Sequence, residues 1–204
     1  MSAISDKLVW CDLETTGIED HDIILEYAIV VTDNNLEQLG HLTSVIIDCN
    51  PNNLIPAGQP RTKDGQMPCY EAHFEAPEGK LSLVGLLQSM ADKTSVDPWS
   101  VEFHQKEIVA WLEEFGIREG MEGPPPLCGS SIHFDRRFLR RHMPSVEKLF
   151  HYRNIDVSAL RELQRRWAPE LELEWPESTH RALEDLRYSL SLLRFYRDRG
   201  FVGL

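Results

Sequence analysis

The fold of this chain is decided by a stretch near its start, Lys7 to Val31, which runs KLVWCDLETTGIEDHDIILEYAIVV. An apolar run lies at each end of the stretch, Lys7–Asp12 and Ile23–Val31, and both runs are typical of buried strands. The turn Thr15-Thr16-Gly17 separates them. We therefore expect the two strands to pair in an antiparallel manner.

The rest of the chain predicts a mixed sheet flanked by helices. A turn at Asp33-Asn34-Asn35 leads to a third strand over Leu39–Asp48, which completes an antiparallel meander. Short strands then alternate with segments of helical spacing, which implies an α/β fold. The expected later elements are helices over Leu81–Ala91 and Val101–Phe115, a strand at Leu127–Cys128, a helix ended by Pro144, a strand near Asn154–Val157, and helices over about Ser158–Trp167 and Ser178–Arg197, the last with Ser178 as its N-cap.

Length and composition indicate one globular domain over residues 1–204. Of its 204 residues, 42% are hydrophobic and 26% are charged. Prolines and glycines concentrate at about 49–80, a segment that we interpret as an excursion within the domain. The sequence shows neither a membrane span nor a signal peptide, and its four cysteines form no Cys-x-x-Cys pair. We expect a cytoplasmic protein with reduced thiols.

The net charge of −12 argues against a protein that coats long nucleic acid, because binding many phosphates requires many cations. Basic residues nevertheless concentrate between Asp135 and Arg166. This segment is either a set of solvated helix faces or a local surface for a short anionic substrate.

Acidic residues lie at the edges of three predicted elements. Asp12 and Glu14 share one face of a strand end, where they would repel each other unless a hard cation such as Mg²⁺ or Mn²⁺ neutralised them. The alternative is a solvated strand terminus. Asp135 lies near the start of a helix, where it also suits the helix dipole. His180 and Asp185 converge only if His180 precedes the last helix, and their spacing also arises by chance.

Four motifs resemble, in order, those of the oligoribonucleases, which belong to the DEDDh-type 3′-5′ exonucleases. They are DLETTG (12–17), GSSIHFDRRFL (129–139), HYRNIDVS (151–158) and HRALEDLR (180–187). The resemblance implies a ribonuclease-H-like sheet of five strands, an antiparallel meander first and parallel strands after it. It also implies that two divalent cations, Mg or Mn, are bound by Asp12, Glu14, Asp135 and Asp185. His180 would be the general base.

The implied reaction is 3′-to-5′ hydrolysis of very short RNA, with dinucleotides preferred, to nucleoside 5′-monophosphates. In the family, a cap of polar side chains recognises the 5′ phosphate, and the matching positions here are Ser131, Arg153 and Ser158. Ala159 follows where family members often carry another hydroxyl, so the cap departs from the family pattern.

Two further positions concern the base and the partner subunit. Ile18 matches an aliphatic wedge, and Tyr152 matches an aromatic that family members lend to the partner's site. The resemblance therefore implies a homodimer. Without it, Tyr152 would be an ordinary core or rim tyrosine.

Two other functions fit the same acids and histidine. A general 3′-5′ exonuclease on longer single-stranded RNA or DNA does not need the HYRNIDVS motif. An inactive nucleotide-binding module on this fold would be expected to have lost one of the five residues, and all five are present. Cys49–Ser100 departs from the family, because only His73, preceded by Met67 and Tyr70, stands where members carry a tryptophan followed closely by a histidine.

Overall fold

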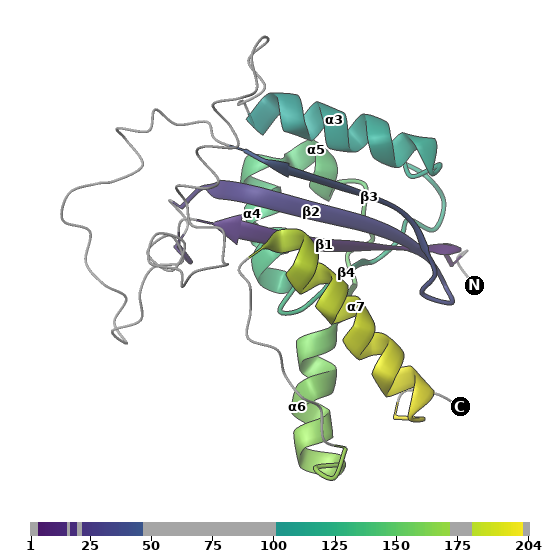
Figure 1. Cartoon of the computed structure of the whole chain (residues 1–204). Coiled ribbons are helices and arrows are strands. Elements are labelled where there is room, and N and C mark those ends of the chain that lie inside the picture. The colour runs from purple at the N-terminus through teal and green to yellow at the C-terminus, as the bar shows by residue number, and fades with distance from the viewer. Residues whose placement is uncertain (1–3, 16, 20–21, 47–100, 172–180, 202–204) are drawn as a thin grey trace, which may run out of the picture.

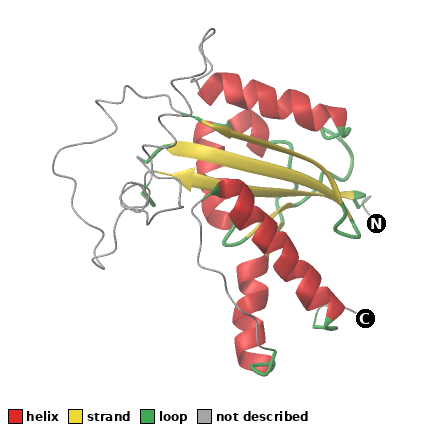
Figure 2. Ribbon diagram, in the orientation of Figure 1, coloured by secondary structure: helices red, strands yellow, loops and turns green. Residues whose placement is uncertain are grey.

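The computed structural model describes residues 4–15, 17–19, 22–46, 101–171 and 181–201. These residues form a five-stranded sheet with helices on both of its faces (Figure 1). Figure 2 shows the longest strands side by side at the centre, with the helices around them. The predicted helix over Leu81–Ala91 and the excursion at 49–80 lie outside the described residues, so the single domain over 1–204 stays a prediction.

The sheet has the predicted mixed topology, with strand order β3-β2-β1-β4-β5. β1 pairs antiparallel with β2, and β2 antiparallel with β3, whereas β4 lies parallel to both β1 and β5. The prediction of an antiparallel meander followed by parallel strands is therefore confirmed. The strands are β1 (Lys7–Thr15), β2 (Ile24–Asp33), β3 (Gln38–Val45), β4 (Leu127–Gly129) and β5 (Asn154–Asp156).

The helices of the described chain follow the predicted order. Pro144 ends α4, as expected, but it also opens a separate short helix, because proline is well suited to the first turn. The elements are α3 (Val101–Glu114), α4 (His133–His142), α5 (Pro144–Glu147), α6 (Val157–Trp167) and α7 (Ala182–Asp198). No helix in the ranges that the structure describes has the length and apolar content needed to cross a membrane.

The predicted start of the last helix at Ser178 is wrong. α7 begins at Ala182, and the preceding Arg181 has an extended backbone with φ −126° and ψ 114°. The Arg181 guanidinium donates hydrogen bonds to the carboxylate of Glu26 on β2. This ion pair holds Arg181 against the sheet, so the helix begins one residue later.

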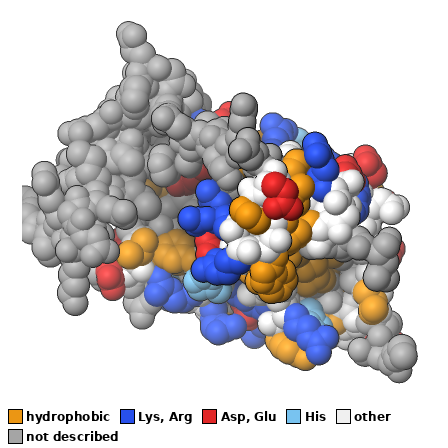
Figure 3. Space-filling model, turned by 90° about the horizontal axis from the view of Figure 1, so that it is seen from below, with side chains coloured by type: hydrophobic (Ala, Val, Ile, Leu, Met, Phe, Trp, Pro, Cys, Tyr) orange, Lys and Arg blue, Asp and Glu red, His pale blue; other side chains and the backbone are white. Residues whose placement is uncertain are grey.

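Basic and hydrophobic side chains alternate on the face seen from below, towards which α6 extends (Figure 3). The last turn of α6 carries Arg165 and Arg166, and Trp167 at its end is 71% exposed. This part of the basic segment therefore consists of solvated helix faces.

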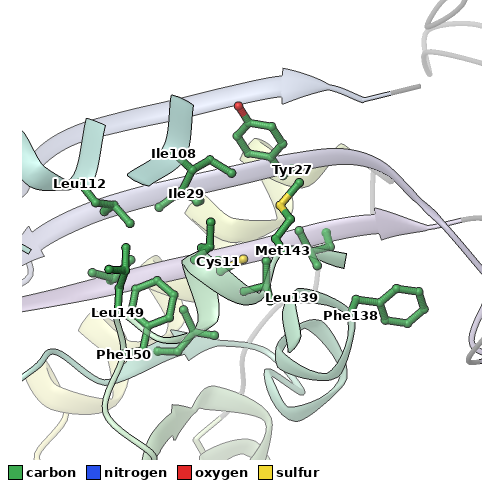
Figure 4. Close-up of a cluster of buried hydrophobic side chains, with 14 of the residues drawn as sticks. Cys11, Tyr27, Ile29, Ile108, Leu112, Phe138, Leu139, Met143, Leu149 and Phe150 are labelled. Carbon is green, nitrogen blue, oxygen red and sulfur yellow. The ribbon is translucent and has the colours of Figure 1, made fainter. Parts of the chain in front are cut away.

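The alternation of side chains along β1 divides the core into two parts. Val9, Cys11 and Leu13 belong to the larger cluster, which lies between the sheet and helices α3, α4 and α5. Figure 4 shows part of this cluster. Trp10 belongs to the second cluster with residues of α6 and α7. Because side chains alternate, Asp12 shares the α7 side of β1 with Trp10.

Gly129 lets β4 approach β1 closely. A Cβ atom at this position would lie 2.7 Å from the backbone oxygen of Cys11, so a larger residue would push the strands apart. β4 pairs with β1 at Val9 and Trp10. Beyond Gly129 the chain turns away, which leaves the end of β1 to be covered by α4.

Candidate active site

Three carboxylates meet at the end of β1. Asp12 and Glu14 come from one face of the strand, and Asp185 comes from the first turn of α7, which packs on that face. One carboxylate oxygen from each residue lies within 4.8 Å of the others. Oxygen donors at this spacing fit a divalent cation.

The fourth predicted acid, Asp135, reaches the same strand from α4. Its side chain is buried, and its Oδ1 accepts a hydrogen bond of 2.9 Å from the backbone N–H of Leu13. Leu13 lies between Asp12 and Glu14, so Asp135 holds the main chain that carries both of these carboxylates. The sequence predicted four converging acids, and the structure brings all four to the end of β1.

The pKa values of these acids reflect their crowding. Burial, followed by the charges of Asp135 and Glu14, raises the pKa of Asp12 well above its ordinary value. Burial, together with nearby Asp185, raises the pKa of Glu14 to about 8. Burial also raises the pKa of Asp135 to about 7, although the Leu13 N–H opposes this shift. A bound cation would favour the ionised forms of all of these carboxyl groups.

A further buried acid, Glu26, lies beside this group and was missed by the sequence analysis. Glu26 stands opposite Glu14 in the β1–β2 register, and its charge raises the pKa of Glu14. Arg181 forms an ion pair with Glu26 at 3.1 Å. The signal in the sequence is a single glutamate within the otherwise apolar run of β2. Arg181 thus supplies positive charge beside the acids.

The predicted general base, His180, lies outside the described residues. The sequence predicted that His180 can converge with Asp185 only if it precedes the last helix, and α7 begins at Ala182. The position of the imidazole stays a prediction.

The predicted phosphate-cap hydroxyls lie together. Ser131 Oγ donates a hydrogen bond of 3.2 Å to Ser158 Oγ. Arg153, the third predicted cap residue, is exposed, and its guanidinium carbon lies 5.3 Å from the centroid of the Tyr152 ring. The two serines come from different elements, the turn after β4 and the first turn of α6.

Tyr152 is 75% exposed, so it is not a core residue. Its ring centroid lies 4.3 Å from that of His151. The segment that carries it is held by Arg136, whose Nη1 donates to the carbonyl oxygen of His151 at 2.7 Å and to Asn154 Oδ1 at 2.6 Å. Arg136 is buried, so this member of the basic segment is not part of a solvated face.

The predicted wedge, Ile18, is 51% exposed. Its carbonyl oxygen accepts a hydrogen bond from the guanidinium of Arg137 on α4. That guanidinium also lies over the rings of Phe134 and Phe138. Ile18 is therefore tied to the helix that carries Asp135.

Comparison with known proteins identifies relatives that match almost the whole chain. The oligoribonuclease of Pseudomonas aeruginosa strain PAO1 is 38% identical over 200 residues, which cover 97% of each chain. That of Pseudomonas savastanoi pv. phaseolicola is 37% identical over 197 residues, or 94% of each chain. The chain belongs to the oligoribonuclease family. A family model described as Exonuclease also matches residues 104–193 of this oligoribonuclease-family chain.

Solved structures support the fold of this family member. Exonuclease I from Methylocaldum szegediense superimposes with a TM-score of 0.57 at 19% identity, over 96% of this chain and 41% of that one. The zinc-bound complex of E. coli ExoI with single-stranded DNA gives a TM-score of 0.57 at 13% identity and the same coverage. The family member thus spans about two fifths of these exonuclease I chains. At these identities the likeness shows the ribonuclease-H-like fold alone.

Proposed function

We propose that this chain is a 3′-to-5′ exoribonuclease that hydrolyses very short RNA, with dinucleotides preferred, to nucleoside 5′-monophosphates. Its membership of the oligoribonuclease family supports the reaction. The observation that carries the proposal is the meeting of Asp12, Glu14 and Asp185 within 4.8 Å. Crowded carboxylates of this kind suit cation-assisted phosphodiester hydrolysis.

Asp12, Glu14, Asp135 and Asp185 are the proposed holders of two divalent cations, Mg²⁺ or Mn²⁺. Such ions, when bound, activate the attacking water and stabilise the charge that develops on the phosphate. The charges agree with this stoichiometry, because four carboxylates balance two dications.

The chain's own residues have further roles in this proposal. Asp135 accepts the Leu13 N–H and so keeps Asp12 and Glu14 on a rigid strand. His180 is the proposed general base, which accepts the proton of the attacking water. An imidazole has an ordinary pKa near 6.5, so it is mostly neutral at pH 7 and able to take that proton.

The proposed substrate contacts account for the preference for short chains. Ser131, Ser158 and Arg153 would bind the 5′ phosphate, while the acids act on the 3′-terminal linkage. The pairing of the two hydroxyls at 3.2 Å and the exposure of the arginine support a common role. A site that recognises both ends of its substrate excludes longer strands. Ile18 would separate the bases as an aliphatic wedge.

The assembly that we propose is a homodimer in which Tyr152 packs against a base in the partner subunit's site. An aromatic ring that is 75% exposed supports this role, because a base or a partner surface would cover it. We also propose a cytoplasmic location. The buried free thiols of Cys11 and Cys128 agree with a reducing compartment.

A general exonuclease on longer single-stranded RNA or DNA is the second candidate. The paired hydroxyls of Ser131 and Ser158 and the net charge of −12 favour the short substrate instead. An inactive nucleotide-binding module is disfavoured by the presence of all four acids and the histidine.

The decisive experiment measures initial rates with Mn²⁺ on 5′-phosphorylated RNA of two, three, five and ten nucleotides. We expect a steep preference for the dinucleotide, and we expect Asp12→Ala to abolish turnover without loss of the fold. Asp6→Ala, which removes an exposed carboxylate just before β1, is the control and should keep full activity. A flat dependence on length would assign the protein to the general exonucleases. Normal activity of Asp12→Ala would end the metal-site proposal.

A further inference from the structure

One carboxylate oxygen organises the two cap serines. Asp156 Oδ1 accepts a hydrogen bond of 2.9 Å from the backbone N–H of Ser131 and another of 2.9 Å from that of Ser158. The serine hydroxyls then meet each other at 3.2 Å. Asp156 ends β5 and is the N-cap of α6, so it joins the turn after β4 to the start of this helix.

The backbone of Ser131 has an unusual conformation that Asp156 supports. Its φ of 51° lies in the left-handed region, which residues other than glycine rarely adopt. The Asp156 carboxylate binds the N–H of this residue and stabilises the turn. The direction of the Ser131 hydroxyl therefore depends on Asp156, although Asp156 is not itself a cap residue.

The same bonds determine which groups can recognise a phosphate. The N–H groups of Ser131 and Ser158 are both directed at Asp156, so contact with an anion falls to the two side chains. The Ser158 hydroxyl can donate to the anion directly, and the Ser131 hydroxyl, which donates to Ser158 Oγ here, can do so after it rotates. The other oxygen of Asp156 lies 3.7 Å from His133 Nδ1 on α4. Phosphate recognition therefore depends on how accurately the hydroxyls of Ser131 and Ser158 are held.

The turn is also connected to the acids. Ser130 Oγ lies 2.7 Å from Ser189 Oγ on α7, and Ser189 Oγ donates a hydrogen bond to the backbone oxygen of Asp185. Through Ser130, the residue before Ser131, the turn is thus in contact with α7, which carries Asp185. The distance between this turn and the acids is therefore determined by packed elements.

We propose that Asp156 is a positioning residue that holds Ser131 and Ser158 as one phosphate-binding unit and so determines the preference for 5′-phosphorylated ends. This inference rests on the proposed function, since the unit has a role only if the chain hydrolyses short RNA. Asp156 acts through the serines and does not touch the substrate.

The chain contains a closely matched control at Asp33. Asp33 Oδ1 also accepts two backbone hydrogen bonds, from Asn35 and Glu37, each of 2.8 Å. The turn that it holds likewise contains a left-handed residue that is not glycine, Leu36, with φ 68°. Asp33 pairs with Lys7, at the opposite end of β1 from the acids. Removing its carboxylate should disturb a turn of the same kind without changing the cap.

The experiment compares kcat and KM for a 5′-phosphorylated dinucleotide with those for its 5′-hydroxyl counterpart. We expect Asp156→Ala to reduce the preference for the phosphate about tenfold, mainly by raising KM for the phosphorylated substrate. Asp156→Asn keeps an acceptor oxygen and should retain most of the preference. Asp33→Ala should leave it unchanged. Circular dichroism and thermal melting check the fold of each variant.

Several results would overturn the inference. One is an unchanged preference in a folded Asp156→Ala variant, and another is an equal loss in Asp33→Ala. If Asp156→Ala does not fold, Asp156→Ser, whose hydroxyl can still cap α6 but is one atom too short to keep the bond to the Ser131 N–H, must show a reduced preference. If the wild-type protein hydrolyses both dinucleotides equally well, the proposed cap is wrong and the inference is wrong with it. If it hydrolyses neither, the proposed function itself is wrong.

Discussion

Glu14 lies where burial and neighbouring acids both oppose ionisation. Its side chain is 6% exposed, and Asp185 and Glu26 act on it from two other elements. A carboxyl group in this position is more stable with its proton or with a cation than as a free carboxylate. Because Glu14 is in this position, we expect the stability of the protein to depend on pH and on metal.

The pH dependence of the metal-free protein follows from the raised pKa of Glu14. Its pKa is about 8 in the folded state, against an ordinary value of 4.5 for an exposed glutamate. The unfolded state therefore ionises first, and the free energy of unfolding falls as pH rises between these values. We expect a lower Tm at pH 8 than at pH 6 in the presence of a chelator, and a smaller difference for Glu14→Gln.

Mg²⁺ or Mn²⁺ should reverse much of the loss in wild-type protein at pH 8, because a bound cation replaces the proton. Glu114→Gln, on the exposed side of α3, is the control, and its Tm should fall with pH as much as that of the wild-type protein. If the Tm of Glu14→Gln fell with pH as much as that of the wild-type protein, another group would cause the pH dependence.

At the scale of elements, two helices deliver acids to the same strand end. α7 brings Asp185 to the face that carries Asp12, and its start is held by the ion pair between Arg181 and Glu26. α4 brings Asp135 to the end of β1 beyond its pairing with β4. The shortness of β4 is essential, because a longer strand would occupy the Leu13 N–H.

Two substitutions of Asp135 separate the effect of its charge from the effect of its hydrogen bond to β1. Asp135→Asn keeps an oxygen that can accept the Leu13 N–H and removes one repulsive charge. We expect its stability to be retained while kcat falls by at least about a hundredfold, because a proposed cation ligand is lost.

Asp135→Ala should in addition lose about 1–3 kcal/mol of stability, since a buried N–H is left without its acceptor. Urea unfolding and single-turnover rates measure the two effects separately. Equal stability of the two variants would contradict the structural role of the hydrogen bond.

At the scale of the whole molecule, the arrangement of exposed aromatic residues bears on assembly. Tyr152 projects from a segment that the buried Arg136 holds in place. A rigid support suits a side chain that is proposed to reach a neighbouring subunit. The proposed dimer would then have two sites, each completed by the other subunit's tyrosine.

Mixing two impaired variants tests this arrangement. In the proposed dimer of one Asp12→Ala and one Tyr152→Ala subunit, the site with intact Asp12 would receive the intact Tyr152 of the partner subunit. Random mixing makes half of the dimers mixed, each with one complete site of two, so we expect recovery to about a quarter of wild-type activity. Trp167→Ala in place of Tyr152→Ala is the control, because Trp167 is exposed but not in the motif. Activity no greater than that of the separate variants would show that the tyrosine is not shared.

The strands and most helices could be predicted from the sequence, because their signals are local. The alternation of Leu8 to Glu14 determines which side chains share a face, and helical spacing placed α3 within one residue of its observed end. The convergence of the four acids could be predicted only because their motifs resemble those of a family.

What the sequence by itself determined was the mixed sheet, the order of its elements and the acids at the end of β1, since these depend on short-range periodicity and on recognisable motifs. Only the tertiary structure decided the burial of Arg136, the pairing of Glu26 with Arg181 and the two serines held by Asp156. The partners in these contacts lie far apart along the chain or belong to different elements. Local pattern cannot specify which of many polar residues will meet when the elements pack.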